Sequence, residues 1–560
     1  MSGLRIGFRR CSVIASLIWA GAISPVVRIC FAQETAISGP KDGRVSGPVF
    51  VPSDSWVYPA LLRLGALGYI TGQSAGMRPW TRQECVRQVE EAESAISRPS
   101  RRTGSREEAQ SLLRTLEREF GRDEQSTVYL ELESVYLRYL GLAGKPLVDG
   151  YNFGQTVIDD YGRPSGQGSN MVAGFSAEAV AGRLSFYTRS EFEHSPAFSS
   201  PAAALKPEFH QLEPVLFGAP NGVNRLQPVE AYMGAQFGNW AITAGKQDIW
   251  WGPGESGPLS LGTNADPFFS VRVTTASPVF LPGFLAKLGG FRLDLVGGEL
   301  SGHHLPARPL LNAQKLTWNP IPDLELGVTR WSLFDGSGVH GFTLGSVLRN
   351  FTANSATFGN AIDPGDRKSG FDFLWRPPVP GRSIALYSDF YADDEPSPLA
   401  SLRRSGFSPG IYFATLPRLP HWDLRVEAPS TRMAGADQGG FFLYWNSIYN
   451  DANTNRGNPL GSWVGRDGRG LVVQSTYWRS AQSKFEFAYR QNRIGAAFLK
   501  GGGTQDDVSG TAAIQPATDV TLRFGAQYER YNIPAVGKSR RDLAATFEMV
   551  LTPHWRIFAR

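Results

Sequence analysis

The chain has 560 residues and a formal net charge of +5, and only 19% of its residues are charged, whereas 12% are aromatic and 62 are glycine. That composition has too little charge for a disordered chain and is richer in aromatic residues and glycine than an average soluble protein. The length could hold three or four ordinary domains, but a barrel can reach this size as one unit. The pattern of residues along the chain therefore has to decide the fold class.

Residues 1–32 have the features of a secretory signal peptide. Three arginines precede an apolar run, and the small residues Cys30 and Ala32 predict cleavage after about Ala32. Pro25 and Arg28 interrupt the run, whereas a membrane-spanning helix needs about 20 apolar residues without interruption. The sequence therefore predicts export rather than an N-terminal membrane anchor.

Removal of this leader changes both the charge and the cysteine content. The leader carries four arginines and no acidic residue, so the formal net charge falls from +5 to +1. A nucleic-acid-binding protein needs a concentrated basic face, which a nearly balanced chain does not supply. Of the three cysteines only Cys85 remains, and one thiol can form neither an internal disulfide nor a cysteine metal cluster. We expect no nucleic-acid partner and no cysteine-bound metal.

After a linker at residues 33–51, the segment 52–125 has the periodicity of helices. Its pattern resembles S-layer homology modules, which hold cell-wall polymers in other envelope proteins, but the same pattern also suits helices with only a packing role. Two pairs have the spacing of a capping box: Thr81 with Glu84, and Ser105 with Glu108. We predict a small helical bundle in the periplasm.

From residue 126 to residue 560 the periodicity changes to two. In the stretch RLSFYTRSEFE, Leu184, Phe186 and Phe192 alternate with charged residues, and KFEFAYRQ and TLRFGAQYE repeat this pattern. Segments of about ten residues are joined alternately by tight turns and by long polar loops, as in outer-membrane barrels. We count 18 to 20 candidate strands in an all-β transmembrane barrel with an apolar lipid-facing side and a polar lumen.

One stretch, residues 245–269, interrupts the strand pattern with GKQDIWWGPGESGPLSLGTNADPFF. Its Gly-Pro pairs favour turns over a helix or a long strand. Aromatic rings can receive the C–H groups of a sugar while polar side chains bind its hydroxyls, and desolvated aromatic contacts contribute about 1 kcal/mol each. The alternative is an inward-folded loop that packs and constricts the lumen. The candidate polysaccharide-binding residues here are Trp250, Trp251, Glu255, Asn264 and Asp266.

A second candidate binding cluster consists of Arg466, Asp467 and Arg469. Guanidinium groups can bind the carboxylates of acidic sugars in a bidentate manner. The alternative for these residues is ion pairing inside the lumen.

The sequence contains weak signals for a metal site and for catalysis. Three consecutive acids on an extended strand cannot all face one calcium ion, so a solvated loop is favoured for Asp393, Asp394 and Glu395. The stretch 406–410 fits G-x-S-x-G, but Pro409 is incompatible with the helix that a nucleophile elbow needs. We predict no metal, no cofactor and no enzymatic activity.

The stretch GKQDIWWGPGESGPLSLGTNADPF resembles the signature of the Wzi capsule assembly family. Three later stretches resemble that family in the same order, and the resemblance spans roughly Val51 to Arg560. It implies about 18 antiparallel strands in an outer-membrane barrel with a small periplasmic helical bundle. It also implies binding of capsular polysaccharide without covalent chemistry. The three stretches are FDFLWRPPVPGRSIALYSDFYADDEPS, LPHWDLRVEAPSTR and YWNSIYNDANTNRGNPLGSWVGRDGRG.

We therefore expect a non-enzymatic outer-membrane lectin that anchors capsular or other surface polysaccharide. Outer-membrane lipid would surround it, and polysaccharide export machinery is a further candidate partner. The alternative is a diffusion channel, because an 18-stranded barrel is wide enough for an aqueous pore; an occluded lumen would favour the lectin. A glycan-modifying enzyme is a third hypothesis. The lipid-facing strands show no polar seam, so we expect a monomer.

Overall fold

The structure is a computed structural model. It describes residues 49–97, 106–121, 128–147, 153–197, 222–304, 306–337, 365–379, 383–393, 399, 402–433, 442–446, 448–449, 451, 453–537 and 539–559. The predicted signal peptide, most of the linker, the capping residue Ser105, and the acids Asp394 and Glu395 lie outside the described residues.

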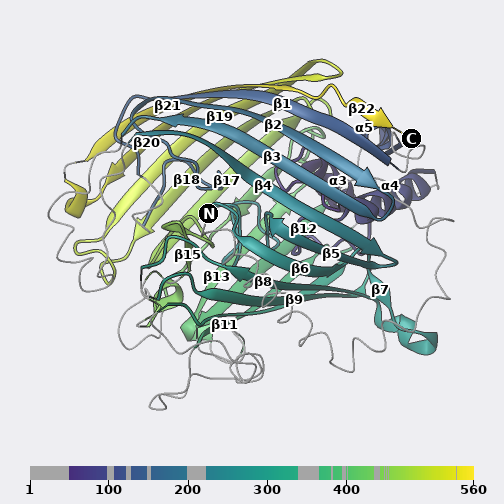
Figure 1. Cartoon of the computed structure of the whole chain (residues 1–560), viewed down its shortest axis with the longest axis horizontal. Helices are drawn as coiled ribbons and strands as arrows, with labels where there is room; N and C mark the ends of the chain where they lie inside the picture. The colour runs from purple at the N-terminus through teal and green to yellow at the C-terminus, as the bar shows by residue number, and fades with distance from the viewer. Residues whose placement is uncertain are drawn as a thin grey trace, which may run out of the picture.

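Antiparallel strands close into a barrel (Figure 1). Its single sheet contains 20 strand segments, but β6 and β7 both pair with β8, and β21 and β22 both pair with β1. The barrel therefore has 18 strand positions, which lies within the 18 to 20 counted from the sequence and agrees with the number that the family resemblance implies. The pairing of β21 and β22 with β1 closes it.

The barrel segments are β1 Val128–Leu142, β2 Gly168–Ala181, β3 Leu184–Ser195, β4 Val223–Phe237, β5 Trp240–Lys246, β6 Phe269–Thr275, β7 Val279–Phe280, β8 Gly290–Glu299, β9 Leu310–Ile321, β10 Leu324–Phe334, β11 Gly365–Trp375, β12 Ile384–Asp393, β13 Ser405–Phe413, β14 Leu424–Glu427, β17 Gly468–Trp478, β18 Lys484–Ile494, β19 Gly503–Ala517, β20 Val520–Asn532, β21 Arg540–Leu551 and β22 Trp555–Ala559. A separate hairpin pairs β15 Thr454–Asn455 with β16 Asn458–Pro459.

The strands alternate between an apolar outer face and a polar inner face. The predicted apolar set Leu184, Phe186 and Phe192 is exposed on the outside of β3, whereas the intervening Glu191 and Glu193 are buried on the inside. This alternation places apolar side chains against lipid and charged side chains in the lumen, where they find partners within the protein. The predicted alternation is confirmed.

The two ends of the barrel differ in the length of their connections. We call one the short-turn end and the other the long-loop end. Tight turns at the short-turn end occupy residues 182–183, 238–239, 322–323 and 518–519. Long connections at the opposite end occupy residues 143–167, 247–268 and 428–467.

Three helices, α3 Val57–Ala66, α4 Arg82–Ser97 and α5 Arg106–Phe120, lie at the short-turn end (Figure 1). The predicted cap of α4 is confirmed, because the Glu84 backbone N–H donates to Thr81 Oγ1 at 3.1 Å. Buried side chains of the helices share one apolar core with Tyr387 and Trp478 of the barrel wall. None of the helices in the described part of the chain combines the length and the hydropathy needed to span a bilayer.

Arg63 of α3 ties this helical bundle to the barrel wall. Its side chain is fully buried, and Nε donates to Glu108 Oε1 of α5 at 2.5 Å. Nη1 donates to the Ala414 carbonyl at 2.7 Å and lies 3.6 Å from Asp423 Oδ2. The guanidinium carbon lies 4.9 Å from the ring centroid of Trp478. One cation thus joins two helices to a turn of the barrel.

We predict that Arg63→Ala loosens the bundle, because it removes the guanidinium group from the buried carboxylates Glu108 and Asp423. Removing one partner of a buried ion pair typically costs about 3–5 kcal/mol. Limited proteolysis of the folded barrel should then cleave within α3 to α5 faster than in the wild type. Arg114→Ala, at an exposed position of α5, is the matched control and should keep wild-type resistance. Equal resistance of both variants would contradict the role of Arg63.

Candidate functional site

The connection between β5 and β6, residues 247–268, folds into the barrel. Trp250 is 7% exposed and Trp251 is fully buried. Trp250 Nε1 donates to the Gly254 carbonyl at 3.2 Å, whereas Trp251 Nε1 donates to Asp294 Oδ2 of β8 at 3.0 Å. Both rings therefore pack inside the protein, as expected for the inward-folded loop.

This loop meets the connection between α3 and α4 inside the barrel. Arg78 and Trp250 exchange two backbone hydrogen bonds of 2.9 Å, and the Gly252 N–H donates to the Gly76 carbonyl at 3.0 Å. Arg78 Nη2 also lies 2.5 Å from Glu255 Oε1, and its guanidinium covers the Trp250 ring at 5.5 Å. We call the paired segments 76–78 and 250–252 the lumen bridge.

The two halves of the lumen bridge enter the barrel from opposite ends. The connection between α3 and α4 contacts the short-turn end, where the Gly72 N–H donates to the Pro322 carbonyl at 2.9 Å. The 247–268 loop follows β5 at the long-loop end. The two segments therefore meet inside the barrel.

Asn264 connects the 247–268 loop to a second inward-folded loop, residues 153–165. Its Oδ1 accepts the Asp159 backbone N–H at 3.0 Å, and the side chain is fully buried. The neighbouring Thr263 carbonyl accepts the Tyr161 N–H at 2.6 Å. Asn264 therefore aligns two loops.

Asp266 connects the same loop to the β15–β16 hairpin. Its carboxylate lies 2.6 Å from Lys246 Nζ and 3.0 Å from Arg456 Nη1, and its backbone carbonyl accepts Asn455 Nδ2 at 2.7 Å. Asp266 is buried, whereas the Arg456 side chain is 46% exposed at the long-loop end. The buried carboxylate thus holds a cation at the surface.

The predicted cluster of Arg466, Asp467 and Arg469 does not converge on one point. Arg466 is buried with its guanidinium 5.6 Å from the ring of Phe498, whereas Arg469 is exposed. Asp467 Oδ1 lies 3.4 Å from Nε of Arg432, whose side chain is 45% exposed. Burial raises the pKa of Asp467, and Arg432 opposes that shift. Arg432 could not be predicted from the sequence, because only the fold brings it to Asp467.

The carboxyl group of Asp159 lies in an environment that disfavours its charged form. Its Oδ1 is buried and, among the residues that the structure describes, has no hydrogen-bond partner. Burial raises its pKa to about 7; Arg490 opposes the shift, and the nearby Glu427 and Asp160 add to it. Asp159 is therefore protonated in mildly acidic solution.

We predict that Asp159→Asn stabilises the 153–165 loop at pH 8 and has little effect at pH 4. The pKa of Asp159 is near 4 when the loop opens and about 7 when it is closed, so the closed loop loses stability as the pH rises through that window. Asparagine stays neutral throughout. Hydrogen exchange of the loop, corrected for intrinsic rates, measures this difference. Equal protection of both proteins at pH 8 would contradict it, and Asp519→Asn on an exposed turn should change nothing.

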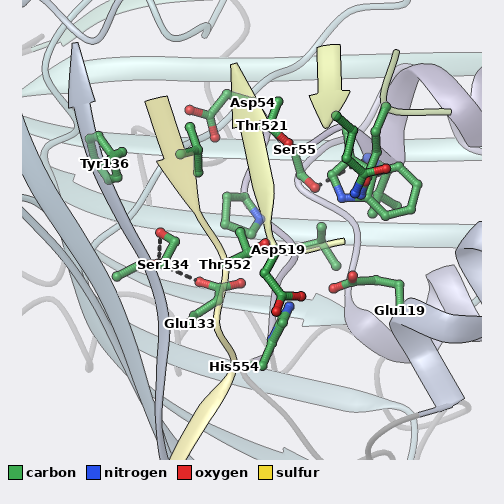
Figure 2. Close-up of a pocket in the computed structure, with 18 of the residues that line it drawn as sticks. Asp54, Ser55, Glu119, Glu133, Ser134, Tyr136, Asp519, Thr521, Thr552 and His554 are labelled. Carbon is green, nitrogen blue, oxygen red and sulfur yellow. Dashed lines mark hydrogen bonds between the residues drawn. The ribbon is translucent and has the colours of Figure 1, made fainter. Parts of the chain in front are cut away.

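A cavity of about 450 Å³ lies between α5 and the barrel wall at the short-turn end (Figure 2). A β-bulge in β1, between Leu132 and Ser134, directs both Glu133 and Ser134 toward it. Ser176 Oγ donates to Glu133 Oε2 at 2.8 Å. Thr552 lines the cavity where β21 gives way to β22.

Much of the charge around this cavity is already paired. Arg189 lies 2.7 Å from Asp54, and Arg523 lies 2.8 Å from Glu548. The remaining carboxyl and hydroxyl groups could bind a small polar molecule. This cavity could not be predicted from the sequence, because a β-bulge leaves no periodic signal.

Comparison with known proteins decides the family. Residues 141–543 match the family described as capsule assembly protein Wzi, which is more than half of the chain. The chain belongs to this family. The resemblance identified in the sequence is confirmed, and no curated protein matches the chain.

A solved member of the Wzi family has the same fold. It is described as Wzi, an outer-membrane protein involved in group 1 capsule assembly in Escherichia coli and a carbohydrate-binding β-barrel. The identity is 17% and the TM-score 0.64, with 91% of this chain and 100% of that chain covered. OprD of Pseudomonas aeruginosa is more distant, with 9% identity, a TM-score of 0.42, and 76% of this chain and 96% of that chain covered.

Family and fold together make this protein an outer-membrane β-barrel of the Wzi family. Six of its eight candidate polysaccharide-binding residues are buried, Glu255 is partly buried and Arg469 is exposed. Contact between any of them and polysaccharide stays a prediction. The six are Trp250, Trp251, Asn264, Asp266, Arg466 and Asp467.

Proposed function

We propose that this protein is a lectin that binds capsular or other surface polysaccharide at its long-loop end and anchors it at the cell surface without covalent chemistry. The long loops would face the exterior, and the short turns with the helical bundle would face the periplasm, which is the usual orientation of such barrels. The predicted leader, residues 1–32, would direct export. The bundle offers polysaccharide export machinery a periplasmic surface, and we propose that the barrel is monomeric.

The lumen bridge is the observation that supports this proposal over a diffusion channel. A channel needs a continuous aqueous path, whereas backbone hydrogen bonds between Arg78 and Trp250 join insertions from both ends of this barrel. At the long-loop end, the loops 153–165 and 453–465 contact residues 262–266 of the 247–268 loop. A polymer would therefore meet the outer surface of these loops rather than a pore.

Exposed arginines at the long-loop end have the chemistry to bind an acidic polysaccharide. Arg432 and Arg456 are each close to half exposed, and Arg469 is exposed. Guanidinium groups recognise carboxylates in a bidentate manner. Asp467 pairs with Arg432 and Asp266 with Arg456, so buried carboxylates orient two of these three cations.

The buried candidate residues would then position the surface rather than touch the glycan. Trp250 and Trp251 hold the 247–268 loop in the barrel, and Asn264 and Asp266 join it to its neighbours. Among the predicted site residues we assign direct contact to Arg469. Glu255 forms an ion pair with Arg78 of the lumen bridge, so we assign it no direct contact.

We predict that replacing Arg432, Arg456 and Arg469 by alanine weakens binding to the host's extracted acidic polysaccharide by about tenfold per arginine. Hydrogen bonds to charged groups contribute about 1.5–3 kcal/mol each. The matched control removes the same charge from exposed arginines of the short-turn end, Arg183, Arg418 and Arg479, and should bind like the wild type. Equal losses in both triple variants, or no loss in either, would contradict the proposed site. Isothermal titration calorimetry of the refolded protein measures the affinities.

Two substitutions of Trp251 distinguish a ring that positions the 247–268 loop from a ring that contacts the polysaccharide directly. Trp251→Ala should lower stability by about 3–5 kcal/mol, because it removes a large buried side chain. Trp251→Phe keeps most of the apolar volume and should retain polysaccharide affinity within about twofold of the wild type. A Phe variant that keeps its thermal stability but loses binding would show that this ring contacts the glycan.

A further inference from the structure

The segment between β7 and β8 projects beyond the rim of the barrel at the short-turn end (Figure 1). It contains the 3-10 helix η4, Gly283–Leu288. Phe284 is 80% exposed, the highest value for any large apolar side chain in the described part of the chain, and Phe280, Leu285 and Leu288 are also exposed. Residues 281–289 join the two strands, whereas hairpin loops usually contain about two to five residues.

The segment is attached to the outer face of the barrel rather than to its lumen. Trp318 Nε1 of β9 donates to the Leu288 carbonyl at 2.6 Å, and the Trp318 ring is stacked on Phe291 with centroids 5.9 Å apart. The strand neighbours Arg292 and Thr317 are buried on the lumen side. Because side chains alternate along a strand, Phe291 and Trp318 face outward, toward lipid.

The composition of the segment suits a membrane interface. Between Ala276 and Gly289 the chain contains one ionisable residue, Lys287, and no acid. A lysine can keep its ammonium among phosphate groups while apolar neighbours enter the acyl region, and tryptophan is enriched at the same level. Exposed Leu316 and Val328 on β9 and β10 continue the apolar surface along the barrel wall.

We infer that residues 279–288 form a membrane foot, which inserts Phe284 and its apolar neighbours into the lipid leaflet at the short-turn end. The continuity of this surface with the lipid-facing wall favours lipid over a protein as its occupant. The foot would fix the height of the barrel in the membrane and its rotation relative to the leaflet. This inference requires an outer-membrane barrel but does not depend on polysaccharide binding.

A fluorescent probe at Phe284 tests the membrane foot. The full-length chain with Phe284→Cys, Cys11→Ser and Cys30→Ser is refolded, then labelled with bimane and reconstituted into vesicles of phosphatidylethanolamine and phosphatidylglycerol. The remaining thiol, Cys85, is buried in the helical bundle, and burial raises its pKa, so it reacts poorly. Brominated lipids should quench most of the emission, whereas aqueous iodide should quench little. The control Thr518→Cys, on the exposed β19–β20 turn, should show the reverse.

If labelling at position 284 disturbs the segment, a probe at position 285 still tests the membrane foot. A bimane at Leu285→Cys reports on the foot while Phe284→Asp and Leu288→Asp remove its apolar character. Lipid quenching at position 285 should fall several-fold, with the barrel's circular dichroism unchanged, whereas Ala517→Asp with Thr518→Asp should leave it intact. Iodide quenching at position 284 without lipid quenching would overturn the inference, since the surface would then be in water and open to a protein partner.

Discussion

Irregular backbone inside a membrane barrel needs hydrogen-bond partners from the protein or from lumen water, and a segment buried away from water depends on the protein alone. In this barrel the segments 76–78 and 250–252 supply those partners to each other through the lumen bridge. One segment belongs to the helical bundle and the other to the loop that carries the two tryptophans. Each insertion therefore fixes the position of the other, although they enter from opposite ends.

A chain of contacts connects the lumen bridge to the outer surface of the molecule. The 247–268 loop is held by hydrogen bonds to Arg78 and Asp294, and it in turn positions the neighbouring loops through Asn264 and Asp266. At the outer end of this chain of contacts, Arg456 is held by a buried carboxylate. If Arg456 binds polysaccharide as proposed, this prior orientation would reduce the conformational entropy that its side chain loses on binding.

Much of the fold could be predicted from the sequence, because each barrel strand carries its own period-two pattern, as Leu184, Phe186 and Phe192 do, and the capping residue Thr81 marks a helix start. The environment of the candidate site could not be predicted in the same way. Residue type left sugar contact and an inward-folded packing loop open for Trp250 and Trp251, and their burial follows from contacts with distant Arg78 and Asp294. The pairing of Asp467 with Arg432 and the bulge at Glu133 likewise depend on tertiary structure, which local periodicity does not encode.

The central claim is that the lumen bridge and the loops around it block the lumen to ions. The conductance of the refolded protein in planar lipid bilayers tests this claim most directly. The account predicts no steady current through the wild type. Replacing residues 247–268 by a short glycine-serine loop removes one half of the bridge and should open a conducting path. A stable open channel in the wild type, with the conductance expected of an 18-stranded pore, would contradict the account and favour the diffusion channel.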